Sequence, residues 1–244
     1  MPVTLILGAT GGIGAALTRR LAAAGHDLVI GARSADRLSA LAGETGAAAF
    51  TLDATTPDGV ESLVQHALDA HGRLDGLVNC VGSILLKPAH LTSPAEFEEV
   101  LRVNLLSAFL ALRTAAKPMQ QQKSGSIVLV SSVAAKLGLA NHEAIAAAKG
   151  GIMGMVGAAA ATYARAGVRV NAVAPGLVRT PLTERMTKTE AAEQQSAQMH
   201  PLGRIGEPDD VAATIAHLLD PDAAGWITGQ TISVDGGFAT VRPR

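Results

Sequence analysis

Cysteine is almost missing from this chain, which has one, Cys80, among 244 residues. A single thiol argues against a disulfide framework and a cysteine-based metal cluster, and it fits a reducing cytoplasm. Clusters of one charge sign are missing as well, because the net charge is −1 and Lys and Arg form no long run. We therefore expect no metal site, no nucleic-acid partner and no anionic membrane surface as partner.

Charged residues are few, at 17% of the chain against 48% hydrophobic, which predicts a well-packed globule and not a disordered chain. A basic leader is missing from the apolar amino terminus, so residues 3–7 are predicted to be a first strand and not a signal peptide. The most apolar stretch, residues 144–161, is mostly alanine and glycine and contains Lys149. A buried helix is expected there, because weakly hydrophobic residues offset a charge within a membrane poorly.

Apolar runs typical of strands alternate with helical stretches along the whole chain. The predicted strands are residues 3–7, 28–31, 47–52, 76–79, 126–131, 168–173 and 231–234. The predicted helices lie near residues 12–24, 34–43, 58–71, 94–121, 142–165 and 208–220. This order predicts an α/β fold, a Rossmann-like doubly wound parallel sheet of about seven strands with helices on both faces. No linker or repeat interrupts it, so residues 1–244 are expected to form a single domain.

The sequence predicts the first residues of two helices from their capping residues. Ser93 is a predicted N-cap with Pro94 at the first helical position and Glu96 closing a capping box. Glu207 and the acids after Pro208 lie at a second helix start, where the helix dipole favours negative charge.

A glycine-rich segment follows the first strand and opens the first helix; it reads Gly8-Ala9-Thr10-Gly11-Gly12-Ile13-Gly14. Glycines at these positions permit a tight turn, let backbone N–H groups approach a pyrophosphate, and allow close packing of helix on strand. An ordinary glycine-rich turn is the alternative. The position at the start of a βαβ unit favours a dinucleotide-binding loop.

The end of the second strand indicates which dinucleotide is bound. NAD sites usually place an acid there for the ribose 2′-hydroxyl, whereas this chain has Arg33 followed by Ser34. A guanidinium suits a 2′-phosphate, although a solvated arginine beside a helix cap is the alternative. We expect NADP(H) to be preferred over NAD(H).

Further segments resemble the short-chain dehydrogenase/reductase family along nearly the whole chain. Asp53 looks like that family's adenine-contacting acid, Asn79-Cys80-Val81-Gly82 resembles its Asn-Asn-Ala-Gly segment, and residues 201–237 resemble the 3-oxoacyl-acyl-carrier-protein reductase branch. The resemblance implies an NAD(P)-binding site that, besides the glycine loop and Arg33, includes Ser34, Asp53, Ala54, Asn79, Val81, Gly82, Lys149, Pro175, Gly176, Val178 and Thr180.

The catalytic residues of the family are only partly matched. Asn104 and Ser132 resemble its asparagine and serine, and Lys149 stands at the lysine of the Tyr-x-x-x-Lys pattern. The tyrosine position, thirteen residues after Ser132, is Ile145, which can neither donate nor ionise. Tyr163, the single tyrosine, is 18 residues further along the predicted helix, or about 27 Å away, so it is expected to be structural.

His142 is a candidate replacement for the missing phenol. It shares a helical face with Ile145 and Lys149 if the helix already includes residue 142, and an imidazole suits acid–base work at neutral pH. Against this, Asn141 is a plausible N-cap, which would leave His142 as a solvated bystander. The other six histidines lack spacing that indicates a metal or catalysis and are expected at the surface.

Two functions follow from these residues. The first is an NADPH-dependent oxidoreductase that reduces a carbonyl or quinone-type acceptor with an altered proton donor. The second is a nicotinamide-dinucleotide-binding protein without meaningful turnover. In either case the small residues of helix 142–165 predict a two-fold interface, and the family resemblance implies a homodimer or homotetramer.

Overall fold

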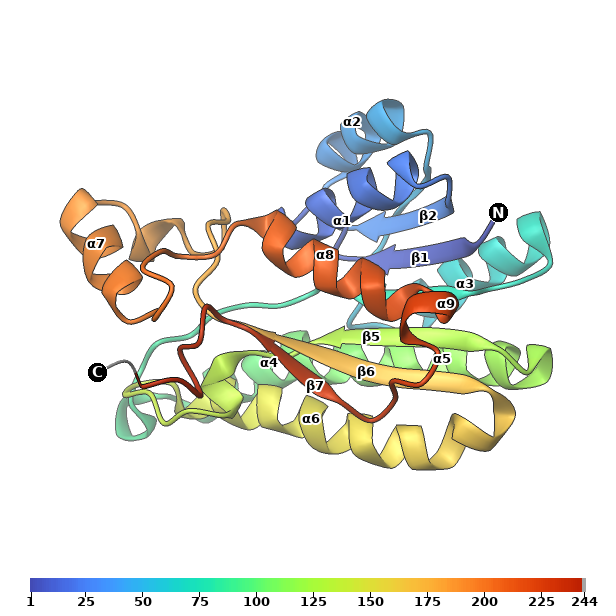
Figure 1. Cartoon of the computed structure of the whole chain (residues 1–244). Coiled ribbons are helices and arrows are strands. Elements are labelled where there is room, and N and C mark those ends of the chain that lie inside the picture. The colour runs from blue at the N-terminus through green and yellow to red at the C-terminus, as the bar shows by residue number, and fades with distance from the viewer. Residues whose placement is uncertain (243–244) are drawn as a thin grey trace.

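The seven strands of the protein lie in one parallel sheet, in the order β3-β2-β1-β4-β5-β6-β7, as the computed structural model shows for residues 1–242 (Figure 1). The strands are β1 Val3–Leu7, β2 Asp27–Ala32, β3 Ala48–Thr51, β4 Gly76–Asn79, β5 Gly125–Val130, β6 Val168–Pro175 and β7 Thr231–Val234. All neighbouring strands pair in parallel. The predicted fold class is confirmed, and three strands have the predicted bounds.

Alternate residues of the strands build two separate cores. Leu5 and Leu7 of β1 belong to the core under one set of helices, whereas Ile6 between them belongs to the core on the other face. The first set is α3 Pro57–His71, α4 Pro94–Leu101, α5 Ser107–Gln122 and α6 Glu143–Tyr163; the second is α1 Gly12–Ala23, α2 Ala35–Thr45 and α8 Pro208–Leu219 (Figure 1). Both faces of the sheet are therefore covered, which explains why the strands lack polar alternation.

The prediction of one α-helix at 94–121 is corrected, because the segment is helical throughout but is not α-helical throughout. A π-helical turn, Arg102–Leu106, separates α4 from α5. The predicted capping box of Ser93 and Glu96 at the start of α4 is confirmed. The π turn is invisible in the sequence because the apolar positions continue through it, and such turns are often found at functional sites.

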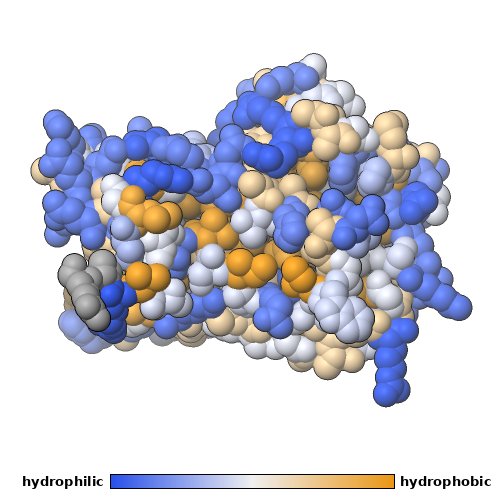
Figure 2. Space-filling model, in the orientation of Figure 1, coloured by the Kyte–Doolittle hydropathy of each residue, from blue (hydrophilic) through white to orange (hydrophobic). Residues whose placement is uncertain are grey.

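Two helices have no counterpart in the prediction, α7 Glu190–Gln198 and α9 Pro221–Ala224. Ser196 is the one buried residue of α7, so this helix has no apolar stripe that a periodicity reading could detect. α7 protrudes from the edge of the sheet where the strands end (Figure 1). Figure 2 shows hydrophilic side chains over α7, while hydrophobic side chains gather nearer the middle of this face.

Helix α6 contains residues 144–161, the most apolar stretch of the sequence. By length and composition it could cross a membrane, but in this fold it packs against β5, β6 and α5. It begins at Glu143 with His142 as its N-cap, whereas Asn141 has a left-handed backbone with φ of +64°. The expectation that Asn141 is the N-cap is therefore wrong by one residue.

Candidate active site

The loop between β1 and α1 is built around glycines that no other residue could replace without strain. Gly8 has φ of +74°, and an ideal Cβ on it would lie 2.8 Å from the Val81 nitrogen. A Cβ on Gly14 would lie 2.4 Å from the Gly8 oxygen. Gly11, the N-cap of α1, has no side chain to occupy the first helical N–H groups. The loop thus has the close backbone approach and the open helix start that a pyrophosphate requires.

A cleft runs from this loop along the carboxyl ends of the strands. Most of the predicted cofactor residues line it, namely Gly8, Thr10, Gly11, Gly12, Ile13, Gly14, Arg33, Ser34, Asp53, Ala54, Val81, Gly82 and Thr180. The other five predicted cofactor residues are not among those that line it, namely Asn79, Lys149, Pro175, Gly176 and Val178. Residues that sequence reasoning missed also line the cleft, among them Arg37, Thr55, Arg102 and Leu182.

One end of the cleft is basic. Arg33 is exposed and makes no ion pair within residues 1–242, and Arg37 lies one helical turn further along α2. Ser34 is the N-cap of α2, but its hydroxyl accepts no capping hydrogen bond. Two guanidinium groups and a hydroxyl are therefore open to the cleft.

Asp53 at the end of β3 is fixed in its charged form. Its Oδ1 accepts hydrogen bonds from Thr55 N at 2.9 Å and from Thr55 Oγ1 at 2.7 Å, and these bonds hold the pKa of Asp53 below its usual range. Arg102 Nη1 lies 3.9 Å from Asp53 Oδ2 and adds a smaller effect in the same direction. The carboxylate oxygens are held by the protein, so they offer an acceptor at a defined place in the cleft.

Lys149 on α6 is buried, with 6% of its surface exposed. Its Nζ donates a hydrogen bond to the Val130 carbonyl at the end of β5 at 2.8 Å. Burial lowers the pKa of Lys149 to about 8, although the neighbouring Cys80 opposes this shift. The thiol itself is inert at neutral pH, since burial raises the pKa of Cys80 to about 12.

Asn104 occupies the π turn and ties it to the loop after β4. Its Nδ2 donates to Ser83 Oγ at 3.0 Å and to the Val100 carbonyl at 2.9 Å, while its Oδ1 accepts from Ser83 N at 3.1 Å. An ideal Cβ on Gly82 would lie 3.1 Å from Asn104 Oδ1 and 3.5 Å from Lys149 Nζ. The structure therefore brings Asn104 and Lys149 together behind Gly82, at the wall of the cleft.

Asn79 has a supporting position at the end of β4. Its Oδ1 accepts from Val81 N at 3.1 Å, and its Nδ2 donates to Ser107 Oγ at 3.1 Å. The side chain is 2% exposed, so it holds the loop that carries Val81 and Gly82 from behind.

Ser132 follows β5 and is half-buried in an extended backbone conformation. Its oxygen accepts a hydrogen bond from Ala134 N at 3.2 Å. Because the N–H is the donor in this bond, the hydroxyl proton of Ser132 remains able to orient an acceptor such as a carbonyl oxygen.

Ile145 lies on α6 one turn before Lys149 and is 5% exposed. It belongs to a small apolar cluster with Val100, Ala134 and Ala148, against which Leu85 and Leu139 pack. The side chain at this position is therefore packed inside this apolar cluster and contributes no polar atom.

The other candidate acids are less well placed. His142 lies outside the helix, and its Nδ1 is 2.7 Å from the Ala140 carbonyl, so the shared helical face assumed for it does not exist. Tyr163 packs against the core at the far end of α6.

His200 overturns the expectation that it lies at the surface. It is 2% exposed, its Nε2 accepts from Leu177 N at 3.2 Å, and its Nδ1 lies 2.8 Å from the Ser196 carbonyl. Ser196 is four residues before His200, but Leu177 is 23 positions away, so the sequence spacing does not reveal the second partner.

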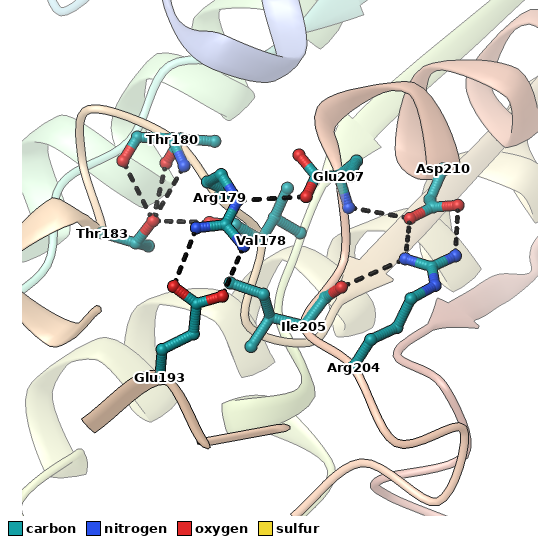
Figure 3. Close-up of polar contacts among 9 residues, drawn as sticks. All are labelled: Val178, Arg179, Thr180, Thr183, Glu193, Arg204, Ile205, Glu207 and Asp210. Atoms are coloured by element: carbon teal, nitrogen blue, oxygen red, sulfur yellow. Dashed lines mark hydrogen bonds and ion pairs between the residues drawn. The ribbon is translucent and has the colours of Figure 1, made fainter. Parts of the chain in front are cut away.

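The segment after β6, residues 178–183, is anchored by the ion pairs of Arg179 (Figure 3). Arg179 donates from Nη2 to Glu193 Oε1 of α7 at 2.6 Å and from Nε to Glu207 Oε1 at 3.1 Å. Thr180 N donates to Thr183 Oγ1 at 3.1 Å, and the Thr180 side chain faces Gly12, where a Cβ would meet its Cγ2 at 2.5 Å. Arg179 thus links α7, the start of α8 and the cleft-lining Thr180.

Comparison with known proteins agrees with this geometry. Residues 8–239 match the family described as enoyl-(acyl carrier protein) reductase. The chain is 38% identical to cis-4-hydroxycyclohexanecarboxylate dehydrogenase of Sinomonas cyclohexanicum, with 98% of this chain and 97% of the relative covered. It is 36% identical to 3-oxoacyl-[acyl-carrier-protein] reductase FabG of Thermotoga maritima, with 97% of each chain covered.

Solved structures also share this fold over nearly the whole chain. A short-chain type dehydrogenase/reductase from Mycobacterium ulcerans superposes with a TM-score of 0.93 at 31% identity, covering 98% of this chain and 90% of that one. ElxO with NADP bound has a TM-score of 0.91 at 28% identity, covering 97% and 98%. The chain belongs to the short-chain dehydrogenase/reductase family of nicotinamide-dependent oxidoreductases.

Proposed function

We propose that this protein is an NADPH-dependent oxidoreductase that reduces a carbonyl compound or a quinone-type acceptor with an altered proton-donor arrangement. The observation that carries the proposal is the retained reaction centre around an apolar residue. Asn104 and Lys149 lie together behind Gly82 at the wall of the cleft, and Ser132 follows β5 two residues after Val130, whose carbonyl binds Lys149. Ile145 stands where the family pattern has tyrosine.

The preference for NADPH over NADH rests on the basic end of the cleft. Arg33 and Arg37 supply positive charge, the Ser34 hydroxyl is uncommitted, and no acid stands at the end of β2. A 2′-phosphate needs such donors, while a 2′-hydroxyl is recognised by an acid. The NADP bound to the similar ElxO supports the same preference.

The residues have the following proposed roles. The glycine loop and Arg33 would hold a dinucleotide, which would supply a hydride when bound. The Ser132 hydroxyl would donate a hydrogen bond to the acceptor oxygen, Asn104 holds the loop that carries Gly82, and the Lys149 ammonium lies behind Gly82 at the cleft wall. The apolar cluster around Ile145 excludes water from the other side.

The absence of a phenol limits the acceptors. Positioned acid catalysis contributes typically about 10²- to 10⁴-fold to a rate. Simple ketones need that contribution most, because the negative charge develops on one oxygen. We therefore propose that vicinal dicarbonyls and quinones, which delocalise the charge, are reduced better than simple ketones or 3-oxoacyl thioesters.

The test is an NADPH oxidation assay with the purified full chain against simple ketones, 3-oxoacyl thioesters, vicinal diketones and quinones. Turnover that is highest for the electron-poor acceptors supports the proposal. NADPH binding without oxidation by any acceptor would establish the alternative, a dinucleotide-binding protein without meaningful turnover, for which the inert side chain at position 145 is the favouring observation.

We also propose that the protein assembles as a homodimer or homotetramer through α6. Gly150, Gly154 and Gly157 have no neighbouring atom within 4 Å of an ideal Cβ, so this face of the helix is open and smooth. An apolar groove formed by Leu101, Leu105, Phe109 and other residues lies beside it. Small residues allow two helices to approach closely, as an interface between copies requires.

A further inference from the structure

The ammonium of Lys149 is buried without a counter-charge. Within residues 1–242 it makes no ion pair, and its one hydrogen bond is to the Val130 carbonyl at 2.8 Å. An ammonium has three N–H donors, so two remain for other partners. A lysine that served only to hold the fold would have its donors satisfied by the protein, because a buried charge is costly.

The groups that surround Lys149 are uncharged on every side. β5 contributes the Val130 carbonyl, and Ser131 Oγ donates to the backbone oxygen of Lys149 itself at 2.9 Å. The π turn contributes the Asn104 amide, and the loop after β4 contributes Gly82 and the neutral Cys80 thiol. On α6 the residue one turn earlier is Ile145. No carboxylate is therefore present to hold the proton on Lys149.

The direction in which the free donors can act follows from Gly82. This residue lines the dinucleotide cleft, and an ideal Cβ on it would come within 3.5 Å of Lys149 Nζ. The ammonium therefore lies at the cleft wall, separated from it by a residue without a side chain. Residues at i and i+4 of a helix are neighbours, so Lys149 also adjoins Ile145, the residue at the position of the missing phenol.

Three other candidate donors are less well suited than Lys149. His142 lies outside α6 with its Nδ1 at the Ala140 carbonyl, and Tyr163 lies at the far end of the helix. The Cys80 thiol, with its pKa raised to about 12 by burial, is too weak an acid. Lys149 is the titratable group that the contacts place at the cleft wall next to position 145.

We propose that Lys149 is itself the general acid of the reaction and replaces the missing phenol, passing its proton to the acceptor oxygen through one water molecule. The carbonyl carbon accepts the hydride, the π electron pair moves to oxygen, and this oxygen takes a proton from the bridging water. That water is reprotonated by the Lys149 ammonium. The resulting neutral amine regains a proton from solvent after the alcohol leaves. This inference rests on the proposed function and assigns its proton source.

The acidity of Lys149 fits this role. Burial lowers its pKa to about 8, which keeps the ammonium protonated at neutral pH and yet able to release its proton. Reduction requires the protonated form, so its rate is constant below this pKa and falls about tenfold per pH unit above it. Oxidation of the alcohol requires the neutral amine and therefore has the opposite dependence.

The first measurement needs no cofactor or substrate. Lysine side chains of the ligand-free protein are labelled and titrated by NMR, with Lys149→Arg to assign the resonance. A midpoint near 8 for Lys149 is expected. A midpoint above 10 would overturn the proposal, because such an ammonium would be too weak an acid.

The second measurement is single-turnover oxidation of NADPH by 2,3-butanedione between pH 6 and pH 10. The wild-type rate should fall above the Lys149 pKa. The affinity of Lys149→Arg for NADPH is measured by fluorescence, and its rate is then compared with wild type at saturating NADPH, because this residue borders the cofactor cleft. Lys149→Arg should lose about 10²-fold or more in rate, since a guanidinium does not release its proton. Lys117→Arg, at an exposed position on α5, is the matched control and should behave as wild type.

The outcomes separate this inference from the proposed function. A wild-type rate that is independent of pH, or a Lys149→Arg rate close to wild type, refutes Lys149 as the acid while the oxidoreductase remains. A loss of about 10²-fold in His142→Ala would assign the role to the imidazole and overturn the inference. A wild-type protein that binds NADPH but oxidises it with none of the acceptors tested would overturn both.

Discussion

Single residues decide the chemistry of this site. The Lys149 side chain has the same position on α6 that the family pattern assigns to it, but its neighbour one turn earlier is an apolar residue packed in a cluster. The proton supply therefore cannot follow the family's usual route. The acceptors that the site can reduce, and the pH at which it does so, depend on which other group is acidic.

Replacing Arg33 should change the choice of cofactor. Arg33→Ala is expected to weaken NADPH binding by about 10-fold or more, because a hydrogen bond to a charged phosphate contributes roughly 1.5–3 kcal/mol. NADH binding should change little. Fluorescence titration of both dinucleotides checks this, and equal affinities of the wild-type protein for NADPH and NADH would refute the preference.

Restoring the phenol should increase activity on simple ketones. Ile145→Tyr places an acid one turn before Lys149, whose ammonium can stabilise the phenolate. The ring is larger than the side chain it replaces, so overpacking against Leu85 and Leu139 should lower the free energy of unfolding by about 1–3 kcal/mol. We expect a higher kcat/KM for cyclohexanone together with a lower urea midpoint. Ile145→Phe is the matched control, since it adds the ring without the hydroxyl and should show the destabilisation alone.

At the scale of elements, the junctions between strands and helices position the site. The π turn places Asn104 toward the loop after β4, and the segment after β6 carries Thr180 to the glycine loop. The ion pairs of Arg179 join this segment to α7 and to the start of α8. α7 has almost no buried surface of its own, so these polar contacts contribute much of what holds it in place.

Removing the Arg179 side chain should loosen α7 without unfolding the protein. Exposed ion pairs contribute about 0–1 kcal/mol each, so Arg179→Ala should lower the free energy of unfolding only slightly. Proteolysis within residues 184–198 should become faster and the KM for the acceptor should rise several-fold. Arg113→Ala removes a similar exposed pair, with Glu61, far from this segment and serves as the control. Unchanged proteolysis in Arg179→Ala would show that the ion pairs do not hold α7.

At the scale of the whole molecule, we expect the open face of α6 to form the proposed interface. Among residues 1–242, no atom lies within 4 Å of an ideal Cβ on Gly150, Gly154 or Gly157, and the adjacent groove contains exposed Phe109 and Leu106. An apolar surface of this kind is normally covered by a partner, and a second copy of the chain offers a self-complementary one.

A large charged residue on this face should separate the copies. Gly154→Glu meets no atom within 4 Å of its Cβ, so the fold of one chain should tolerate it. We expect light scattering to show a dimer or tetramer for the wild-type protein at micromolar concentration and a smaller species for Gly154→Glu. Circular dichroism should remain unchanged. A monomeric wild-type protein would refute the interface.

The sequence by itself determined the sheet, the glycine loop and many of the residues along the cleft. Strands and most helices were predictable because their apolar periodicity is local, and the glycine loop because its conformational demands fall on adjacent positions. The spacing of Ser132, Ile145 and Lys149 also placed these residues, since a strand end and one helix keep them near each other.

Only the tertiary structure decided the features that depend on partners far apart in the chain. The π turn at Asn104 is stabilised by its hydrogen bonds to Ser83, 21 positions away. The His200 ring accepts a hydrogen bond from Leu177, 23 positions away. α7 is held by the ion pair between Arg179 and Glu193, and no sequence periodicity reveals this contact. The acidity of Lys149 likewise follows from its burial among uncharged groups. Desolvation and long-range hydrogen bonds are properties of the packed molecule, and the order of residues in the chain does not specify them.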